Sequence, residues 1–134
     1  MSDMLSKKPY VTRAFYQWIV ESECTPYIMI NTKSKRVEVP RNLVKDNRIV
    51  FDVSPTSIKE FEIDNEYVYF KAQFQGVEET IYAPIEAVLA IYAAENGDGF
   101  MFEEEPIPDA PKKENGDDSK ASEKPSDGTF KIVD

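Results

Sequence analysis

The 134-residue chain contains no histidine and only one cysteine, Cys24. Histidine is the commonest general base and the commonest metal ligand, so its absence removes the usual route to acid–base catalysis and leaves no ligand set for structural zinc. A single thiol cannot form an internal disulfide, and we interpret Cys24 as a buried, unreactive residue of a protein in the reducing cytoplasm. These absences favour a binding protein over an enzyme.

Long apolar runs and glycine-rich motifs are also missing. No stretch of 18 or more apolar residues is present, so we expect no membrane-spanning segment. The first ten residues, MSDMLSKKPY, lack the apolar region of a secretory signal. The five glycines are scattered and form no phosphate-binding loop. We therefore expect a cytoplasmic protein with no cofactor and no metal.

Positive charge is scarce, because 16 lysines and arginines face 25 aspartates and glutamates and leave a net charge of −9. Such a chain repels nucleic acid phosphates and anionic lipids. Only KSKR at 33–36 is locally basic, and we interpret it as a solvated loop, with an RNA-binding module kept as the alternative. The carboxylates of Glu78, Glu79 and 103–105 lie in polar runs, which favours a solvated face over a catalytic pair. Peptide or protein partners are the better expectation.

Residues 9–23, PYVTRAFYQWIVESE, are predicted to form a helix that has Pro9 in its first turn. At about 100° per residue one apolar face gathers Val11, Ala14, Phe15, Trp18 and Ile19, while Tyr16 and Val20 lie outside it. This apolar arc is wider than packing on one core requires. It indicates either deep burial under loops or contact with a second subunit.

Short strands are predicted to follow, at 27–31, 36–39, 48–53, 58–63, 67–74 and 77–83. The predicted strand 36–39 ends at Pro40, which cannot donate a hydrogen bond to a sheet. In 58–63 the alternation of apolar and polar residues is imperfect. Gly76 can take the positive φ of a tight connection between 67–74 and 77–83. Several short strands at this spacing predict an antiparallel barrel or sandwich, and so a mainly β fold with an N-terminal helix, of the α+β class.

A second helix is predicted for 84–96, because Pro84 opens the segment and Ile85, Val88, Leu89 and Tyr92 recur at helical spacing. Gly97 would close this helix. The apolar stretch 99–102 is expected to fold back as a short edge strand.

From Glu103 onward polar and charged residues dominate, so the segment cannot bury enough apolar area to offset its ordering entropy. We predict a flexible N-terminus at 1–8, a folded domain at 9–105, a disordered acidic linker at 106–128 and an apolar tip at 129–134. The tip is either a frayed end or a docking hook.

Several long strings, among them TRAFYQWIVE, TPYIMIN and VLAIYAAENGDGFMFE, resemble the stringent starvation protein B family, adaptors of the ClpXP protease. The resemblance covers most of residues 9–105. It implies a small Sm-like β fold, a groove for part of the ssrA tag that is added to stalled nascent chains, and a tail that docks on the N-terminal domain of the ClpX unfoldase. It also implies a homodimer paired through the first helix, whose interface we assign to Val11, Phe15, Tyr16, Trp18 and Ile19.

An extended peptide is held best by an apolar trough with a few polar anchors or along a sheet edge. The candidate groove residues are Ile49, Val50, Phe51, Ser54, Ser57, Ala72, Gln73, Phe74, Gln75, Gly76, Phe100, Met101 and Phe102. Without the family resemblance, Ile49, Phe51 and Phe74 are more typical of a core.

Two departures from the family pattern concern function. The tail ends FKIVD where relatives commonly read LRVVK, so the docking residues here are Phe130, Lys131, Ile132 and Val133, and Asp134 reverses the closing charge. Gln73 replaces a family arginine, which turns a cationic contact to the tag into a neutral amide. We expect weaker or altered tag recognition.

Overall fold

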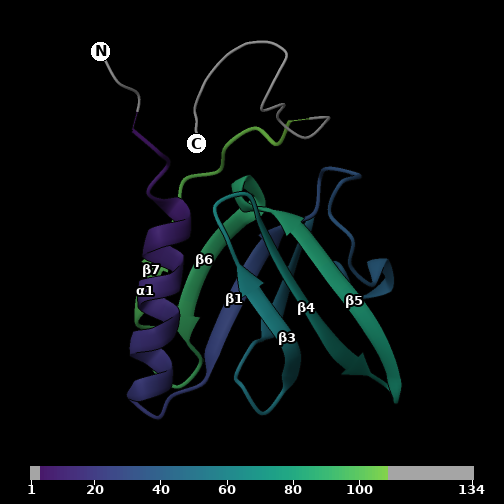
Figure 1. The fold of residues 1–134 in the computed structure, drawn as a ribbon. Coiled ribbons are helices and arrows are strands. Elements are labelled where there is room, and N and C mark those ends of the chain that lie inside the picture. Colours follow the sequence, from purple (N-terminus) through teal and green to yellow (C-terminus); the bar gives the residue numbers. More distant parts are fainter. Residues whose placement is uncertain (1–3, 109–134) are drawn as a thin grey trace.

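Two antiparallel sheets and one helix form a two-layered body in the computed structural model, which describes residues 4–108 (Figure 1). The four-stranded sheet has the order β2 (Arg48–Asp52), β1 (Pro26–Asn31), β6 (Val88–Ala93) and β7 (Gly99–Met101). The three-stranded sheet has the order β3 (Ile58–Ile63), β4 (Tyr67–Phe74) and β5 (Val77–Pro84). The predicted mainly β fold with an N-terminal helix is confirmed, as a sandwich. The predicted tail motif 129–134 and the linker beyond Pro108 lie outside the described residues.

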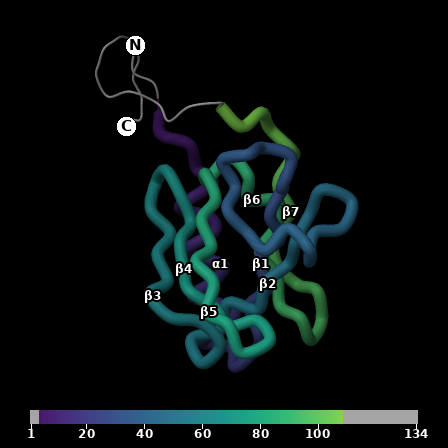
Figure 2. Tube along the Cα trace, turned by 90° about the vertical axis from the view of Figure 1, so that its right-hand side faces the viewer, coloured from purple at the N-terminus to yellow at the C-terminus, as the bar shows by residue number. Residues whose placement is uncertain are grey.

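Helix α1 (Lys8–Glu21) begins one residue before the predicted start and packs mainly on β6, beside the three-stranded sheet. The second layer therefore consists of α1, β3, β4 and β5, as Figure 2 shows from the side. Ile19 is 2% exposed and anchors the helix in the core. The helix ends where the Ser22 amide donates to the Trp18 carbonyl at 3.0 Å. Within residues 4–108 no helix is long and apolar enough to cross a membrane.

The β4–β5 hairpin turns at Gln75 and Gly76, whose φ values of 54° and 80° are both positive. Two consecutive left-handed residues match the right-handed twist of the strands that they join. The expected role of Gly76 is confirmed, and Gln75 shares it. The imperfect alternation of 58–63 is confirmed as well, because the β3–β4 register shifts between Lys59 and Glu62, at a Glu60 with φ of 56°.

The predicted helix at 84–96 is wrong. Ile85–Ala87 form one 3-10 turn, and Val88–Ala93 form strand β6, which pairs with β1 on one side and β7 on the other. The strand is central in its sheet, between β1 and β7, and five of its six residues are buried and apolar. An uninterrupted apolar run matches helical spacing as well as strand alternation, and the pairing partners decided between them. Gly97 does have a positive φ of 74°, but in the β6–β7 turn.

Two smaller expectations also changed. Residues 36–39 form no strand, because the Val37 amide donates a hydrogen bond back to the Ser34 carbonyl and the chain turns there. Glu38 alone forms a β-bridge, to Tyr82 on β5. Cys24 is half-buried, not fully buried. The predicted edge strand after the β6–β7 turn is confirmed as β7.

Candidate functional site

The two sheets meet at Phe51 on β2, which is 4% exposed. Its ring centroid lies 5.3 Å from that of Phe70 and 5.8 Å from that of Phe74, both on β4. Successive side chains of β2 point to opposite faces of the sheet, so Phe51 points inward while Val50 next to it is 41% exposed. The end of β2 and the end of the β4–β5 hairpin are thereby held together over an aromatic floor.

The turn after β2 is fixed by its own side chains. Asp52 Oδ1 accepts hydrogen bonds from the Ser54 amide at 2.9 Å and from the Ser54 hydroxyl at 2.7 Å. The Ser54 and Ser57 hydroxyls are 2.9 Å apart, and the Ser57 amide donates to the Ser54 carbonyl at 2.9 Å. The turn therefore presents a set of hydroxyl groups in a defined position beside the aromatic floor.

The tip of the β4–β5 hairpin supplies polar groups that can donate and accept hydrogen bonds. Gln73, Gln75 and Gly76 are exposed, and Gln73 pairs across the hairpin with Glu78. Val77, opposite Phe74, is 57% exposed. Ala72 pairs with Ile58 on β3, one residue beyond Ser57, so the serine turn and the hairpin belong to the same end of the three-stranded sheet. This end combines exposed amides and hydroxyls with apolar surface, which suits an extended peptide.

The structure therefore brings most of the predicted groove residues together at one end of the sandwich. Ile49, Phe51 and Ala72 are 5%, 4% and 8% exposed and contribute the floor. The members with accessible side chains or backbone at this end are Ser54, Ser57, Gln73, Phe74, Gln75 and Gly76. Val50 is exposed on the opposite, outer face of the four-stranded sheet.

Phe100, Met101 and Phe102 are not brought to this end, because β7 and β2 are opposite edges of the four-stranded sheet. The Phe100 ring lies 5.6 Å from the Phe15 ring of α1, and Phe102 lies beneath the ammonium of Lys8 at 5.1 Å. Met101, which is 73% exposed, shares the outer face of the sheet with Val50 through a row of paired residues, Val50–Met29–Ala90–Met101. A peptide wall from these residues would be a separate surface.

The predicted dimer residues divide between the inner and the outer face of α1. Ile19 is buried, and Val11, Phe15 and Tyr16 are half-buried. Tyr16 donates its hydroxyl to the Val53 carbonyl at 3.0 Å and stacks on Phe61, with ring centroids 4.6 Å apart. Burial, and to a lesser degree the nearby Asp52, raises the pKa of the Tyr16 hydroxyl.

The outer face of α1 exposes large side chains. Trp18 is 47% exposed, and Tyr10, which the helical pattern did not place on the apolar face, is 44% exposed. Tyr10 and Trp18 are eight residues apart, about 80° around the helix at about 100° per residue, so both belong to its outer half. An apolar stripe of this kind on a surface helix is typical of a contact with another chain.

Two hollows could not be found from the sequence. One, of about 380 Å³, lies between α1 and β3 and is lined by Arg13, Tyr16, Gln17, Val20, Glu21, Phe61 and Ile63. The other, of about 560 Å³, lies between the loop at 31–36 and the segment at 104–107. The residues that line each hollow come from segments far apart in the chain, so no local sequence pattern predicts either hollow. Among residues 4–108, no cluster of three or more Asp, Glu or Cys residues is placed to hold a metal ion.

Comparison with known proteins identifies the family of this chain. The family model described as stringent starvation protein B matches residues 6–131. A stringent starvation protein B homolog of Haemophilus influenzae is 44% identical over 103 residues, which cover 77% of this chain and 69% of the relative. The chain therefore belongs to the stringent starvation protein B family.

Proposed function

We propose that this protein is an adaptor that binds ssrA-tagged polypeptides and delivers them to the ClpXP protease, without chemistry of its own. Membership of the stringent starvation protein B family carries the proposal. The site at the end of the sandwich supports it, because Phe51 and Phe74 supply apolar contact there while Ser54, Ser57 and Gln73 offer polar anchors.

The peptide would lie in extended form. β2 is an edge strand of its sheet, and an edge strand can hydrogen-bond to an added chain. Main-chain bonds would supply affinity, and side chains such as Gln73 would choose among sequences. The serine turn is held by four hydrogen bonds among Asp52, Ser54 and Ser57, so little ordering entropy is lost on binding.

We further propose a homodimer that pairs through the outer face of α1, around Trp18 and Tyr10. Delivery would use the segment 129–134, whose residues Phe130, Lys131, Ile132 and Val133 would dock on the N-terminal domain of ClpX. A dimer carries two such segments, so weak individual contacts gain from effective concentration.

A labelled ssrA peptide, titrated against the full chain by fluorescence anisotropy, tests tag binding. Saturable binding that Phe74→Asp removes, while the melting temperature shows a folded protein, supports the site. No binding at concentrations well above the micromolar range refutes the proposed function.

Delivery is tested separately. Removing residues 129–134 should abolish the stimulation of ClpXP degradation of a tagged substrate and leave the anisotropy titration unchanged. Undiminished stimulation by the shortened chain would refute the docking role of the segment.

A further inference from the structure

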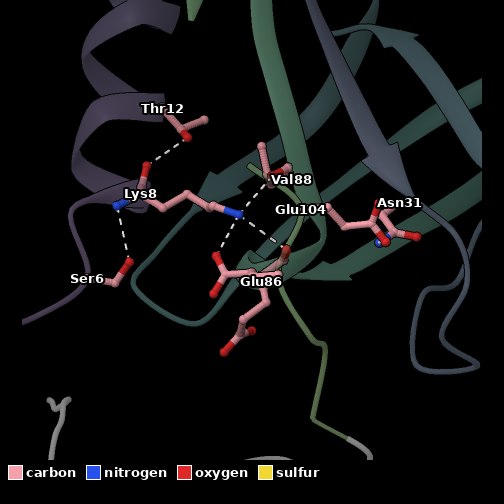
Figure 3. A network of polar contacts seen from close by, with 8 residues as sticks. Ser6, Lys8, Thr12, Asn31, Glu86, Val88 and Glu104 are labelled. Carbon is pink, nitrogen blue, oxygen red and sulfur yellow. Dashed lines mark hydrogen bonds and ion pairs between the residues drawn. The ribbon is translucent and has the colours of Figure 1, made fainter. Parts of the chain in front are cut away.

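The first residue of α1, Lys8, is a buried cation, only 5% exposed. Its ammonium donates hydrogen bonds to the carbonyls of Val88 at 2.9 Å and Glu86 at 3.2 Å (Figure 3). It forms an ion pair with the Glu105 carboxylate at 2.7 Å and lies 5.1 Å above the centre of the Phe102 ring. Three donors thus have three acceptors, and the aromatic face covers the remaining side.

This position is unfavourable for a positive charge that has no anion beside it. The ammonium is removed from water, and the first turn of a helix carries a partial positive charge of its own. The Glu105 carboxylate supplies the compensating charge. The burial of Lys8 and the position of Glu105 therefore depend on each other.

Other contacts hold the residues around Glu105, which we call the strap, residues 102–108. The Phe102 amide donates to the Leu89 carbonyl at 2.8 Å, and Lys33 pairs with Glu104 at 2.8 Å. Arg36 donates to the Pro108 carbonyl at 2.8 Å, and Ile107 packs against the core. The predicted disordered linker begins at residue 106, inside the strap, yet cations from two separate parts of the chain bind the strap as far as Pro108.

We propose that Lys8 is a latch that fixes the strap on the body, so that the backbone of this segment is as rigid as the strands beside it. The latch joins the strap to α1 and to the start of β6. Lys8 is 80 residues from Val88 in sequence and further still from Glu105. The proposal does not depend on the proposed function. If the protein is an adaptor, the strap lies between the folded body and the proposed docking residues in sequence, and Lys8 ties it to the helix that we assign to the dimer.

The test uses the full chain and backbone ¹⁵N relaxation. In the wild type, the order parameters of Glu103, Glu104, Glu105 and Ile107 should be near 0.85, as in β6, since rigid backbone gives about that value. Lys8→Met keeps an unbranched apolar stem in the buried position and removes the ion pair. Glu105→Gln keeps the stem and removes the charge partner. In both variants the order parameters of the strap should fall below about 0.6.

Glu104→Gln is the matched control, because Glu104 pairs with the exposed Lys33 and the two side chains are 47% and 57% exposed. This variant should keep the rigid strap. A second measurement compares acylation of Lys8 with that of the exposed Lys7 beside it. Lys8 should react at least tenfold more slowly in the wild type and approach the rate of Lys7 in Glu105→Gln.

The proposal is overturned if the strap of the wild type has order parameters below about 0.6, or if both Lys8→Met and Glu105→Gln leave them unchanged. It is also overturned if Lys7 and Lys8 react at equal rates in the wild type. Should Glu105→Gln fail to fold, Lys8→Met still decides, because a methionine is accommodated in an apolar site without a counter-charge.

Discussion

Gly99, at the start of β7, has no room for a side chain. A Cβ atom placed on it would lie 2.2 Å from the Ile91 carbonyl oxygen and 2.5 Å from the Tyr92 Cα, both backbone atoms of β6. Neither atom can move aside as the end of a flexible side chain could. Gly99→Ala must therefore push β7 away from β6, to which it is joined over only three residue pairs.

Overpacking of this kind costs about 1–3 kcal/mol, and the lower entropy of an unfolded chain with alanine returns about 0.4–1 kcal/mol. The expected net loss is about 1–2 kcal/mol. For a body of about 100 residues, at about 4 °C per kcal/mol, the melting temperature should fall by about 4–8 °C. Thermal unfolding followed by circular dichroism measures this fall.

The fluorescence of Trp18, the only tryptophan, gives a second readout. Phe100 on β7 contacts Phe15, and the Phe15 and Trp18 rings are 5.5 Å apart, edge to face. Displacing β7 should shift the Trp18 emission before global unfolding. The matched control is Gly97→Asn, since nothing lies within 4 Å of a Cβ there and asparagine tolerates a φ of 74°. A melting temperature of Gly99→Ala within 2 °C of the wild type would contradict the close approach.

Three further predictions concern charge and assembly. Asp64, more than burial or Glu62, raises the pKa of Tyr67 to about 12. Because the folded pKa lies above the ordinary tyrosine value of about 10, the contribution of Tyr67 to folding stability is complete below pH 10 and is lost as the pH rises from 10 to 12. Asp64→Asn should lower that pKa in a tyrosinate absorbance titration, and no change would contradict the assignment to Asp64. Trp18→Asp should give a monomer in analytical ultracentrifugation, whereas a wild-type chain that sediments as a monomer would refute the dimer. Gln73→Arg should tighten binding of an acidic ssrA peptide by about fivefold, about 1 kcal/mol, at low salt, and Gln73→Glu should weaken it; equal affinities for all three would place residue 73 outside the site.

Local patterns predicted those elements whose cause is local. The first helix was predicted to within one residue at its start, because Pro9 and the apolar spacing of Phe15 and Ile19 are helix signals in themselves. The hairpin at Gly76 was predicted because a positive φ favours glycine. The bulge in β3 was visible as broken alternation.

The spatial grouping of the candidate residues followed from the sequence only in part. Residues near one another in the chain, such as Gln73 and Gly76, stayed together at the sandwich end. Phe100 and Phe102 were expected there too, but the strand order puts β7 at the far edge of the sheet. Strand order depends on pairing between distant segments, which one apolar run does not reveal.

The sequence by itself determined the family, the helix, the hairpin and the mainly β class, because each of these is written in neighbouring residues or in long matching strings. Only the tertiary structure made β6 a strand and buried Lys8 against Glu105. An apolar segment takes the form that its partners allow, and a charged side chain is buried only where a distant part of the chain brings an opposite charge and hydrogen-bond acceptors to meet it.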